Sequence, residues 1–127
     1  IEPRNLGKVF QIFEEEAKVG IVCSGKFIQN EYNEATGTYM CNSNKHLKEL
    51  QHKYNIETTN HDFVAGNIFW IRTSLLKNFF DQRSILAIRS QLEEGNALDF
   101  DKGTYIHSWE RIMSWIATSQ EYSIYGI

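Results

Sequence analysis

The chain has 127 residues, of which 42% are hydrophobic and 23% charged, and its formal net charge is −3. This composition is typical of one folded domain and excludes a disordered segment. Because no stretch is strongly basic, it also argues against a nucleic-acid partner, which would need a Lys/Arg face to neutralise phosphates.

The sequence carries no sign of membrane insertion or secretion. No run approaches the roughly 18–20 apolar residues that span a bilayer, and the first residues lack a signal peptide's apolar segment. Cys23 and Cys41 are too few for a disulfide framework, and the four histidines show no zinc spacing with them. A reduced, intracellular protein is the simplest interpretation, with a single disulfide between the two cysteines as the alternative, and we expect a cytoplasmic location. Because the chain begins with Ile1, we expect a processed piece or a part of a longer protein.

The first half of the chain predicts alternating helices and strands. Residues 3–17 are predicted to be helical, because apolar residues recur there at three- and four-residue spacing after Pro3. The β-branched run VGIVC that follows predicts a buried strand. Residues 27–41 are turn-rich and predict a hairpin or a loop. Residues 42–55 predict a helix capped by Ser43 or Asn44.

The second half continues this alternation. The expected elements are a strand over 62–73, a short helix capped by Thr73, a helix over 82–96 closed by Gly95, a helix over 104–117 and a final strand over 122–127. Alternating strands and helices favour an α/β fold with a layered sheet flanked by helices. No internal repeat or linker interrupts residues 1–127, so we expect a single domain or domain fragment.

The helix over 104–117 has an apolar face at helical spacing. At about 100° per residue, one stripe collects Ile106, Trp109, Ile112, Met113 and Ile116. We expect this stripe to pack into the core.

Polar residues of the same helix lie on the other side of the helical wheel. His107, Arg111 and Ser114 fall on the opposite flank, and Glu110 lies at its border, next to His107. A half-desolvated carboxylate is suited to act as a general base. His107 could serve as a metal ligand, a proton carrier or a hydrogen-bond donor to a phosphate. Arg111 could bind a phosphate or orient Glu110. The alternative is an ordinary polar helix flank without a chemical role.

Two stretches, FVAGNIFWIR and DKGTYIHSWERI, together resemble the rhamnan synthesis protein F family of bacterial polysaccharide-assembly proteins, which are regarded as glycosyltransferases. The positions that carry the resemblance are Phe63, Gly66, Phe69, Trp70 and Arg72, followed by Asp101, Gly103, Thr104, His107, Glu110 and Arg111. The stretch FEEEAKVGIVCSG also fits, so the resemblance covers most of residues 8–120.

The resemblance implies the second, acceptor-side half of an A-type glycosyltransferase domain. In that fold a Gly-containing strand lies beside the sugar site, and a downstream helix carries an acidic residue suited to act as base. By position, Glu110 would take the acceptor proton in an inverting transfer. His107 and Arg111 would contact the diphosphate or a metal.

The same resemblance implies a set of sugar-binding residues. Gly66 would allow close approach of the ligand to the backbone, and Asn67 and Arg72 would supply polar contacts. Trp70 and Trp109 would offer flat faces to a sugar. A regular strand cannot point both Asn67 and Trp70 into one cleft, so we expect Trp70 to line it and an irregular backbone at Gly66 to bring Asn67 there. A core position for Trp70 is the alternative.

The chain is shorter than a complete domain of this type. The nucleotide-binding half, with an Asp-x-Asp motif holding divalent Mn or Mg, is expected upstream and would be absent here. Asp99 and Asp101 form such a pattern, but we interpret them as charges at a helix start, and we assign no metal to this chain.

These features lead to two functional hypotheses. The first is a glycosyltransferase of cell-surface polysaccharide (rhamnan or lipopolysaccharide-type) biosynthesis, which uses a nucleotide-sugar donor and a glycan acceptor at the inner face of the cell membrane. This fragment alone could be inactive. The second is a non-catalytic carbohydrate-binding or assembly module with the same fold.

Overall fold

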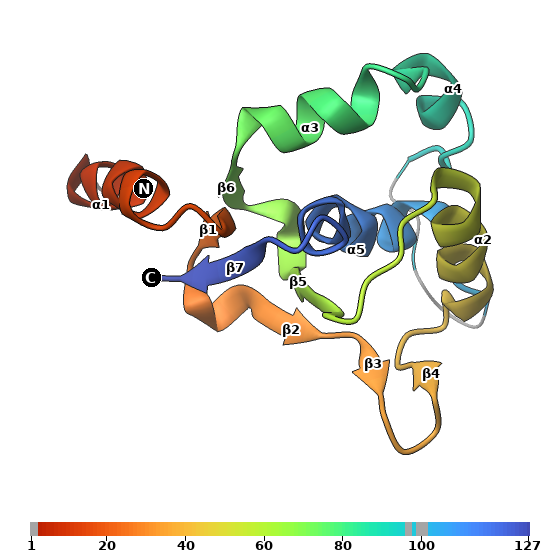
Figure 1. Cartoon of the computed structure of the whole chain (residues 1–127). Coiled ribbons are helices and arrows are strands. Elements are labelled where there is room, and N and C mark those ends of the chain that lie inside the picture. Colours follow the sequence, from red (N-terminus) through yellow and green to blue (C-terminus); the bar gives the residue numbers. More distant parts are fainter. Residues whose placement is uncertain (1–2, 96–97, 99–101) are drawn as a thin grey trace.

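The computed structural model describes residues 3–95, 98 and 102–127 (Figure 1). Its helices are α1 (Pro3–Glu15), α2 (Asn44–Tyr54), α3 (Thr73–Phe80), α4 (Ile85–Arg89) and α5 (Tyr105–Thr118). Its strands are β1 (Val19–Cys23), β2 (Ile28–Asn30), β3 (Tyr32–Asn33), β4 (Thr38–Tyr39), β5 (Asp62–Val64), β6 (Phe69–Ile71) and β7 (Ser123–Gly126). Two 3₁₀ turns are η1 (Gly25–Phe27) and η2 (Ala65–Asn67). The α/β class expected from the sequence is therefore confirmed. No helix of the described part is long and apolar enough to cross a membrane.

A three-stranded sheet forms one side of the core. Its strand order is β6-β1-β7, with β1 antiparallel to β6 and parallel to β7. All five residues of β1 are buried, as its β-branched run predicts, because both faces of this central strand are covered. Strands β2 and β5 form a separate antiparallel pair, and β3 and β4 form the hairpin expected between residues 27 and 41.

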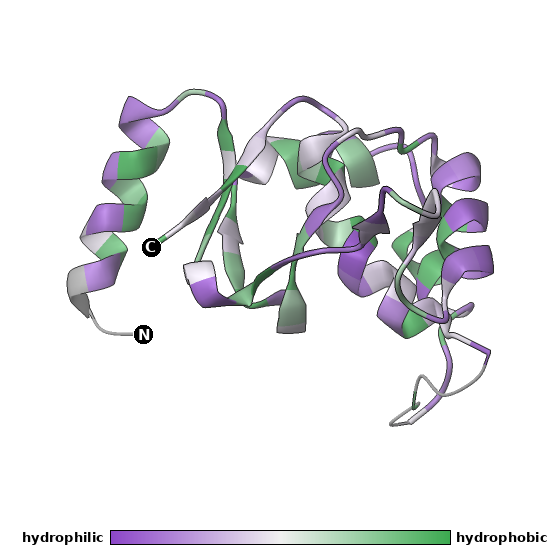
Figure 2. Ribbon diagram, turned by 90° about the horizontal axis from the view of Figure 1, so that it is seen from below, coloured by the Kyte–Doolittle hydropathy of each residue, from purple (hydrophilic) through white to green (hydrophobic). Residues whose placement is uncertain are grey.

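Helix α1 lies to one side of this sheet, and α2 lies at the opposite end of the molecule (Figures 1 and 2). Val9 and Ile12 of α1 pack on Val19 and Val22 of β1 in a small cluster of their own. In Figure 2, hydrophobic and hydrophilic residues alternate along both helices, which is the pattern of helices with one buried face.

Helix α5 lies at the centre of the molecule, with α2, α3 and β5 around it (Figure 1). Trp109, Ile112 and Ile116 are buried as expected, whereas Ile106 and Met113 of the same stripe are half-buried. The stripe is not the whole buried surface of α5, because the helix is covered on several sides.

The buried residues of α5 that lie outside the expected apolar stripe are Ser108, Ser114, Trp115, Ala117 and Thr118. Ser114 is fully buried and accepts a hydrogen bond from the Val64 N–H at 3.0 Å, and Trp115 is also fully buried.

The segment over 62–73 forms two strands where one was expected. Strand β5 pairs with β2 and strand β6 pairs with β1, so the chain changes sheets between them. The change occurs at η2, where Gly66 has φ 79° and Asn67 has φ 53°. The irregular backbone expected at Gly66 is therefore present, since glycine adopts positive φ without a steric cost.

Two helix predictions need correction. The helix expected over 82–96 is restricted to Ile85–Arg89, where the Ser84 hydroxyl caps the helix by accepting from the Ala87 N–H. Thr73 is the first residue of α3, and the N-cap position is occupied by Arg72. Periodicity overestimates the longer helix because the chain after Arg89 turns toward the start of α5.

The start of α5 is capped by groups that the sequence did not suggest. Thr104 is the N-cap, and its hydroxyl accepts from the His107 N–H at 3.1 Å. The carboxylate of Glu93 accepts from the backbone N–H of Tyr105 at 2.7 Å and of Ile106 at 3.0 Å. These bonds satisfy donors that a helix start leaves unpaired. Asp99 and Asp101, which we expected in this role, lie outside the described residues.

Replacing Glu93 with glutamine should destabilise the chain by about 0.5–2 kcal/mol at neutral pH. Burial alone would raise the pKa of Glu93, but the hydrogen bonds from Tyr105 and Ile106 outweigh it and lower the pKa below the ordinary 4.5. The stabilisation is therefore complete above pH 4.5 and is lost as the pH falls through the lowered pKa. Urea unfolding between pH 2 and 7 measures the effect.

Glu94→Gln is the control for this prediction, because Glu94 is exposed one residue away. Equal stability losses in the two variants, or a Glu93→Gln loss that persists unchanged at pH 2, would show that the Glu93 carboxylate does not act as this cap.

Candidate functional site

The two stretches that carry the family resemblance meet in space. The Gly66 N–H donates a hydrogen bond to Glu110 Oε1, with 2.7 Å between the two atoms. The Val64 N–H donates to Ser114 Oγ, four residues further along α5. Since residues four apart share one helix face, the main chain from Val64 to Gly66 runs along the Glu110–Ser114 face of α5. We call this contact the motif junction.

An ion-pair chain extends the motif junction into the protein. Arg111 Nη1 lies 2.5 Å from Glu110 Oε2, and Arg111 Nε donates to Glu31 Oε2 at 2.9 Å. Glu31 is only 3% exposed, and its other oxygen accepts from the Cys41 N–H at 2.7 Å. The Arg111 guanidinium also covers the Phe63 ring, at 4.4 Å from its centroid. Arg111 therefore joins α5 to the β2–β3 and β4–α2 connections.

Glu31 was missed by the sequence analysis. It stands in a turn-rich stretch, and its partner Arg111 lies 80 residues away. No local pattern distinguishes it from the exposed Glu34. Only the pairing across the fold shows that this carboxylate is buried.

Glu110 keeps part of its surface open to solvent. Its side chain is 23% exposed. A carboxylate has about four lone-pair sites, and the bonds from Gly66 and Arg111 use one on each oxygen. Both oxygens can therefore accept a further hydrogen bond from a ligand hydroxyl.

The His107 ring is oriented by the helix cap. The Thr104 hydroxyl accepts from the His107 N–H and lies 2.6 Å from His107 Nδ1. Because Nδ1 is engaged with Thr104, Nε2 is the ring nitrogen that remains for a ligand.

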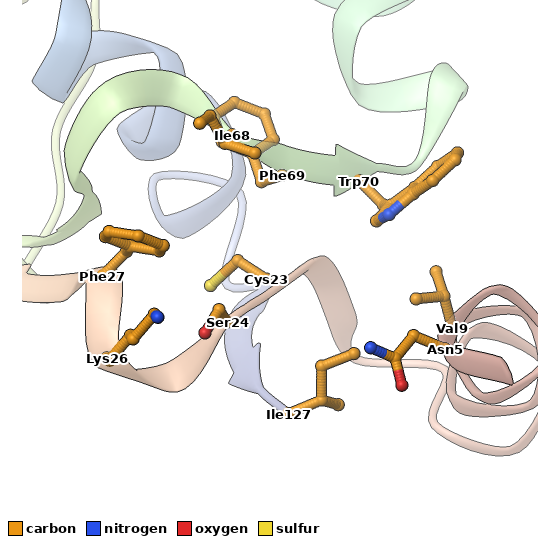
Figure 3. A pocket seen from close by; sticks show the side chains of 10 residues that line it. All are labelled: Asn5, Val9, Cys23, Ser24, Lys26, Phe27, Ile68, Phe69, Trp70 and Ile127. Atoms are coloured by element: carbon orange, nitrogen blue, oxygen red, sulfur yellow. The ribbon is translucent and has the colours of Figure 1, made fainter. Parts of the chain in front are cut away.

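Trp70 lines a groove of about 520 Å³ (Figure 3). The groove is enclosed by α1, the end of β1, η1, β6 and the last residue, and its lining consists of Asn5, Val9, Cys23, Ser24, Lys26, Phe27, Ile68, Phe69, Trp70 and Ile127. Figure 3 shows Phe27 and Trp70 on two sides of the groove, with Cys23 and Ser24 between them. The Trp70 side chain is 39% exposed. The groove is mainly apolar, and burial raises the pKa of the Cys23 thiol and keeps it neutral.

The groove and the motif junction are neighbours along the chain. Strand β6 begins two residues after Asn67 and supplies Phe69 and Trp70 to the groove. Glu110, His107 and Asn67 are not among the residues that line it. The structure thus brings Gly66, Glu110 and Arg111 into one contact, and it places Trp70 in an adjoining groove.

Two further residues expected at the sugar site contact the protein itself. Trp109 is 8% exposed and packs against the rings of Tyr54 and Phe79, with centroids 5.4 and 6.3 Å away.

The guanidinium of Arg72 bonds to three main-chain carbonyls, those of Val19, Phe13 and Glu16, at 2.6 to 3.0 Å. Arg72 therefore holds the end of α1 against the start of β1.

Within the described ranges, no group of three or more His, Cys, Asp or Glu side chains is placed to hold a metal ion. Asp99 and Asp101, the Asp-x-Asp pattern of this sequence, lie outside the described residues.

Comparison with known proteins gives no assignment: no family model, no curated protein and no solved structure matches this chain.

Proposed function

We propose that this chain is the acceptor-side part of a glycosyltransferase that acts in cell-surface polysaccharide synthesis. The observation that supports this most is the hydrogen bond between Gly66 and Glu110, because it joins two family-like stretches that are 44 residues apart. Stretches that act at one site should meet in the folded chain, and these two do so through backbone and carboxylate.

Glu110 is the base in this proposal. As the acceptor hydroxyl attacks the anomeric carbon, its oxygen forms the new C–O bond and its proton passes to the carboxylate. The bond between the anomeric carbon and the diphosphate breaks, and the nucleoside diphosphate leaves with the electron pair. The partly exposed carboxylate of Glu110, fixed by Gly66 and Arg111, supports this role.

The neighbouring residues would bind and orient the two substrates. Trp70 and Phe27 would pack against the apolar face of the glycan acceptor in the groove. Asn67, exposed on the turn, would contact the sugar, and His107 Nε2 would donate to the diphosphate. The donor-binding half, with any divalent metal, would belong to another part of the full-length protein. We place that protein in the cytoplasm, at the inner face of the membrane.

A non-catalytic carbohydrate-binding module is the second candidate. The same contacts favour this candidate if their role is structural. Each Glu110 oxygen already accepts a hydrogen bond, and Arg111 is paired with both Glu110 and Glu31. In such a module the motif junction would serve to fix the Gly66 turn and the adjoining groove.

Replacing Glu110 with glutamine separates the two candidates. The glutamine carbonyl can still accept from the Gly66 N–H, so the fold should persist, whereas transfer by the full-length protein should fall about 10²–10⁴-fold with loss of the base. The measurement is acceptor-dependent release of nucleoside diphosphate, with thermal melting of the same preparation. Glu34→Gln, at an exposed site, is the control and should keep full activity. A folded Glu110→Gln protein with normal turnover would contradict the base assignment.

A further inference from the structure

A second, polar cleft lies away from the Trp70 groove, at the C-terminal end of α2. Its volume is about 360 Å³, within the range of roughly 300–1,000 Å³ typical of ligand pockets. The last turns of α2, the segment after it and Tyr39 of β4 enclose this cleft, which shares no lining residue with the groove. Figure 1 shows two of the segments that line it, the end of α2 and the chain that leads from α2 to β5.

Several polar side chains of the cleft form no hydrogen bond or ion pair with the part of the chain that the structure describes. Lys48, His52, Asn55, Glu57 and His61 make no side-chain hydrogen bond or ion pair with the described residues. They come from two separate segments, α2 and the stretch from 55 to 61, and together they supply donors and acceptors to one hollow.

Other residues hold the walls of the cleft in place. The Tyr39 hydroxyl donates to Gln51 Oε1 at 2.5 Å, and Gln51 Nε2 donates to the Ile56 carbonyl at 3.2 Å. Asn55 ends α2 in the left-handed conformation, with φ 54°. The free side chains are thus attached to a backbone that local hydrogen bonds fix.

One wall of the cleft is aromatic. The rings of Tyr39 and His61 lie 5.5 Å apart, and each packs on the buried Trp115 ring at 5.4 Å. The other contact of His61 is a stack on Tyr32 at 4.7 Å. Burial lowers the pKa of His61 despite the opposing charge of Asp62, so its imidazole is neutral at pH 7 and offers one donor and one acceptor.

The charges of the cleft favour an uncharged ligand. Lys48 and Glu57 balance each other, and the carbonyl end of α2 carries a partial negative charge. The negative charge of a phosphate or nucleotide would be repelled by this end of the helix dipole and by the Glu57 carboxylate. A polyol is uncharged and is not repelled, because its hydroxyls donate to Glu57 and accept from Lys48.

We propose that this cleft is a binding site for an uncharged sugar. The apolar face of the sugar ring packs on Tyr39, while its hydroxyls exchange hydrogen bonds with Lys48, Asn55, Glu57 and the ring nitrogens of His61. The site involves neither Glu110 nor the Trp70 groove. The proposal therefore goes beyond the proposed transfer function, and each of the two can be tested independently of the other.

The test is a titration of the ¹⁵N-labelled chain with the methyl glycosides of rhamnose, glucose and N-acetylglucosamine, followed by NMR. Inorganic phosphate is the charged comparison. At least one glycoside is expected to shift the signals of residues 48–61, including the Asn55 side-chain amide, and to do so more strongly than phosphate.

Three variants identify the side chains that bind. Asn55→Gly removes the amide and keeps the left-handed backbone. His61→Phe keeps the ring contacts and removes both nitrogens, and Lys48→Met keeps most of the apolar stem. Each should weaken glycoside binding at least tenfold. Lys45→Met, at an exposed α2 position outside the cleft, should leave it unchanged.

Three outcomes would overturn the proposal. The first is the absence of glycoside-induced shifts at 48–61 at the highest soluble concentration, and the second is stronger binding of phosphate. The third is unchanged glycoside affinity in those of the three variants that fold. Shifts confined to residues around Trp70 would contradict the cleft site while leaving the proposed function intact.

Discussion

Replacing Arg111 with methionine is expected to lower the free energy of unfolding by about 3–5 kcal/mol. Methionine keeps an apolar side chain over the Phe63 ring but removes the cation that pairs with Glu31 and Glu110. Glu31 is then a carboxylate that is 3% exposed and has no positive partner among the groups it contacted. The large loss comes from that uncompensated buried charge. Urea unfolding monitored by circular dichroism measures it.

Two companion variants show whether the loss comes from Glu31. Adding Glu31→Gln to Arg111→Met should recover a large part of the loss, because both buried charges are then gone. Lys77→Met breaks an exposed ion pair with Asp81 and should cost only about 0–1 kcal/mol. An Arg111→Met loss no greater than that of Lys77→Met would contradict the structural role of the ion-pair chain.

Replacing Gly103 with alanine is expected to cost about 2–5 kcal/mol, the sum of a left-handed backbone penalty and a steric clash. Gly103 has φ 66°, and an added Cβ would lie 2.5 Å from Ser43 Cα and 2.6 Å from the Asn42 carbonyl oxygen. The approach is close because the Thr104 N–H donates to Ser43 Oγ at 3.0 Å, which ties the start of α5 to the start of α2. Thermal melting and urea unfolding measure the loss.

Gly95→Ala is the matched control for the clash. Gly95 has a similar φ of 75°, but an added Cβ would have no neighbour within 4 Å among the described residues. Its loss should therefore be only the backbone penalty of about 1–2 kcal/mol. If the two alanine variants were equally stable, the contact between residue 103 and Ser43 would not be as close as described.

Local pattern was enough to predict the elements whose character is decided by their own residues. Strand β1 is a β-branched run that is buried throughout, and α5 has apolar residues at helical spacing. The irregular backbone at Gly66 could also be predicted. A regular strand would point Asn67 and Trp70 to opposite faces, and a glycine permits the local change of direction that avoids this.

Pairings across the fold could not be predicted in this way. Glu31 meets Arg111 over 80 residues, and Glu93 caps α5 from 12 residues upstream of Tyr105. Ser114 was assigned to the polar flank without a buried partner because periodicity describes one helix in isolation, whereas in the fold it bonds to Val64 of β5. The candidate site could likewise be predicted only in part. The motif positions suggested Glu110 and Trp70, but the fold was needed to show that Gly66 bonds to Glu110 and that Trp70 lines an adjoining groove.

The most direct test of the proposed function is the rate at which the full-length wild-type protein releases nucleoside diphosphate from a panel of nucleotide sugars, with and without glycan acceptors. The proposal predicts that one nucleotide sugar is consumed only when an acceptor is present, and that its sugar appears in the product glycan. A folded full-length protein that binds glycans but transfers no sugar from any donor would contradict the enzyme and favour the binding module.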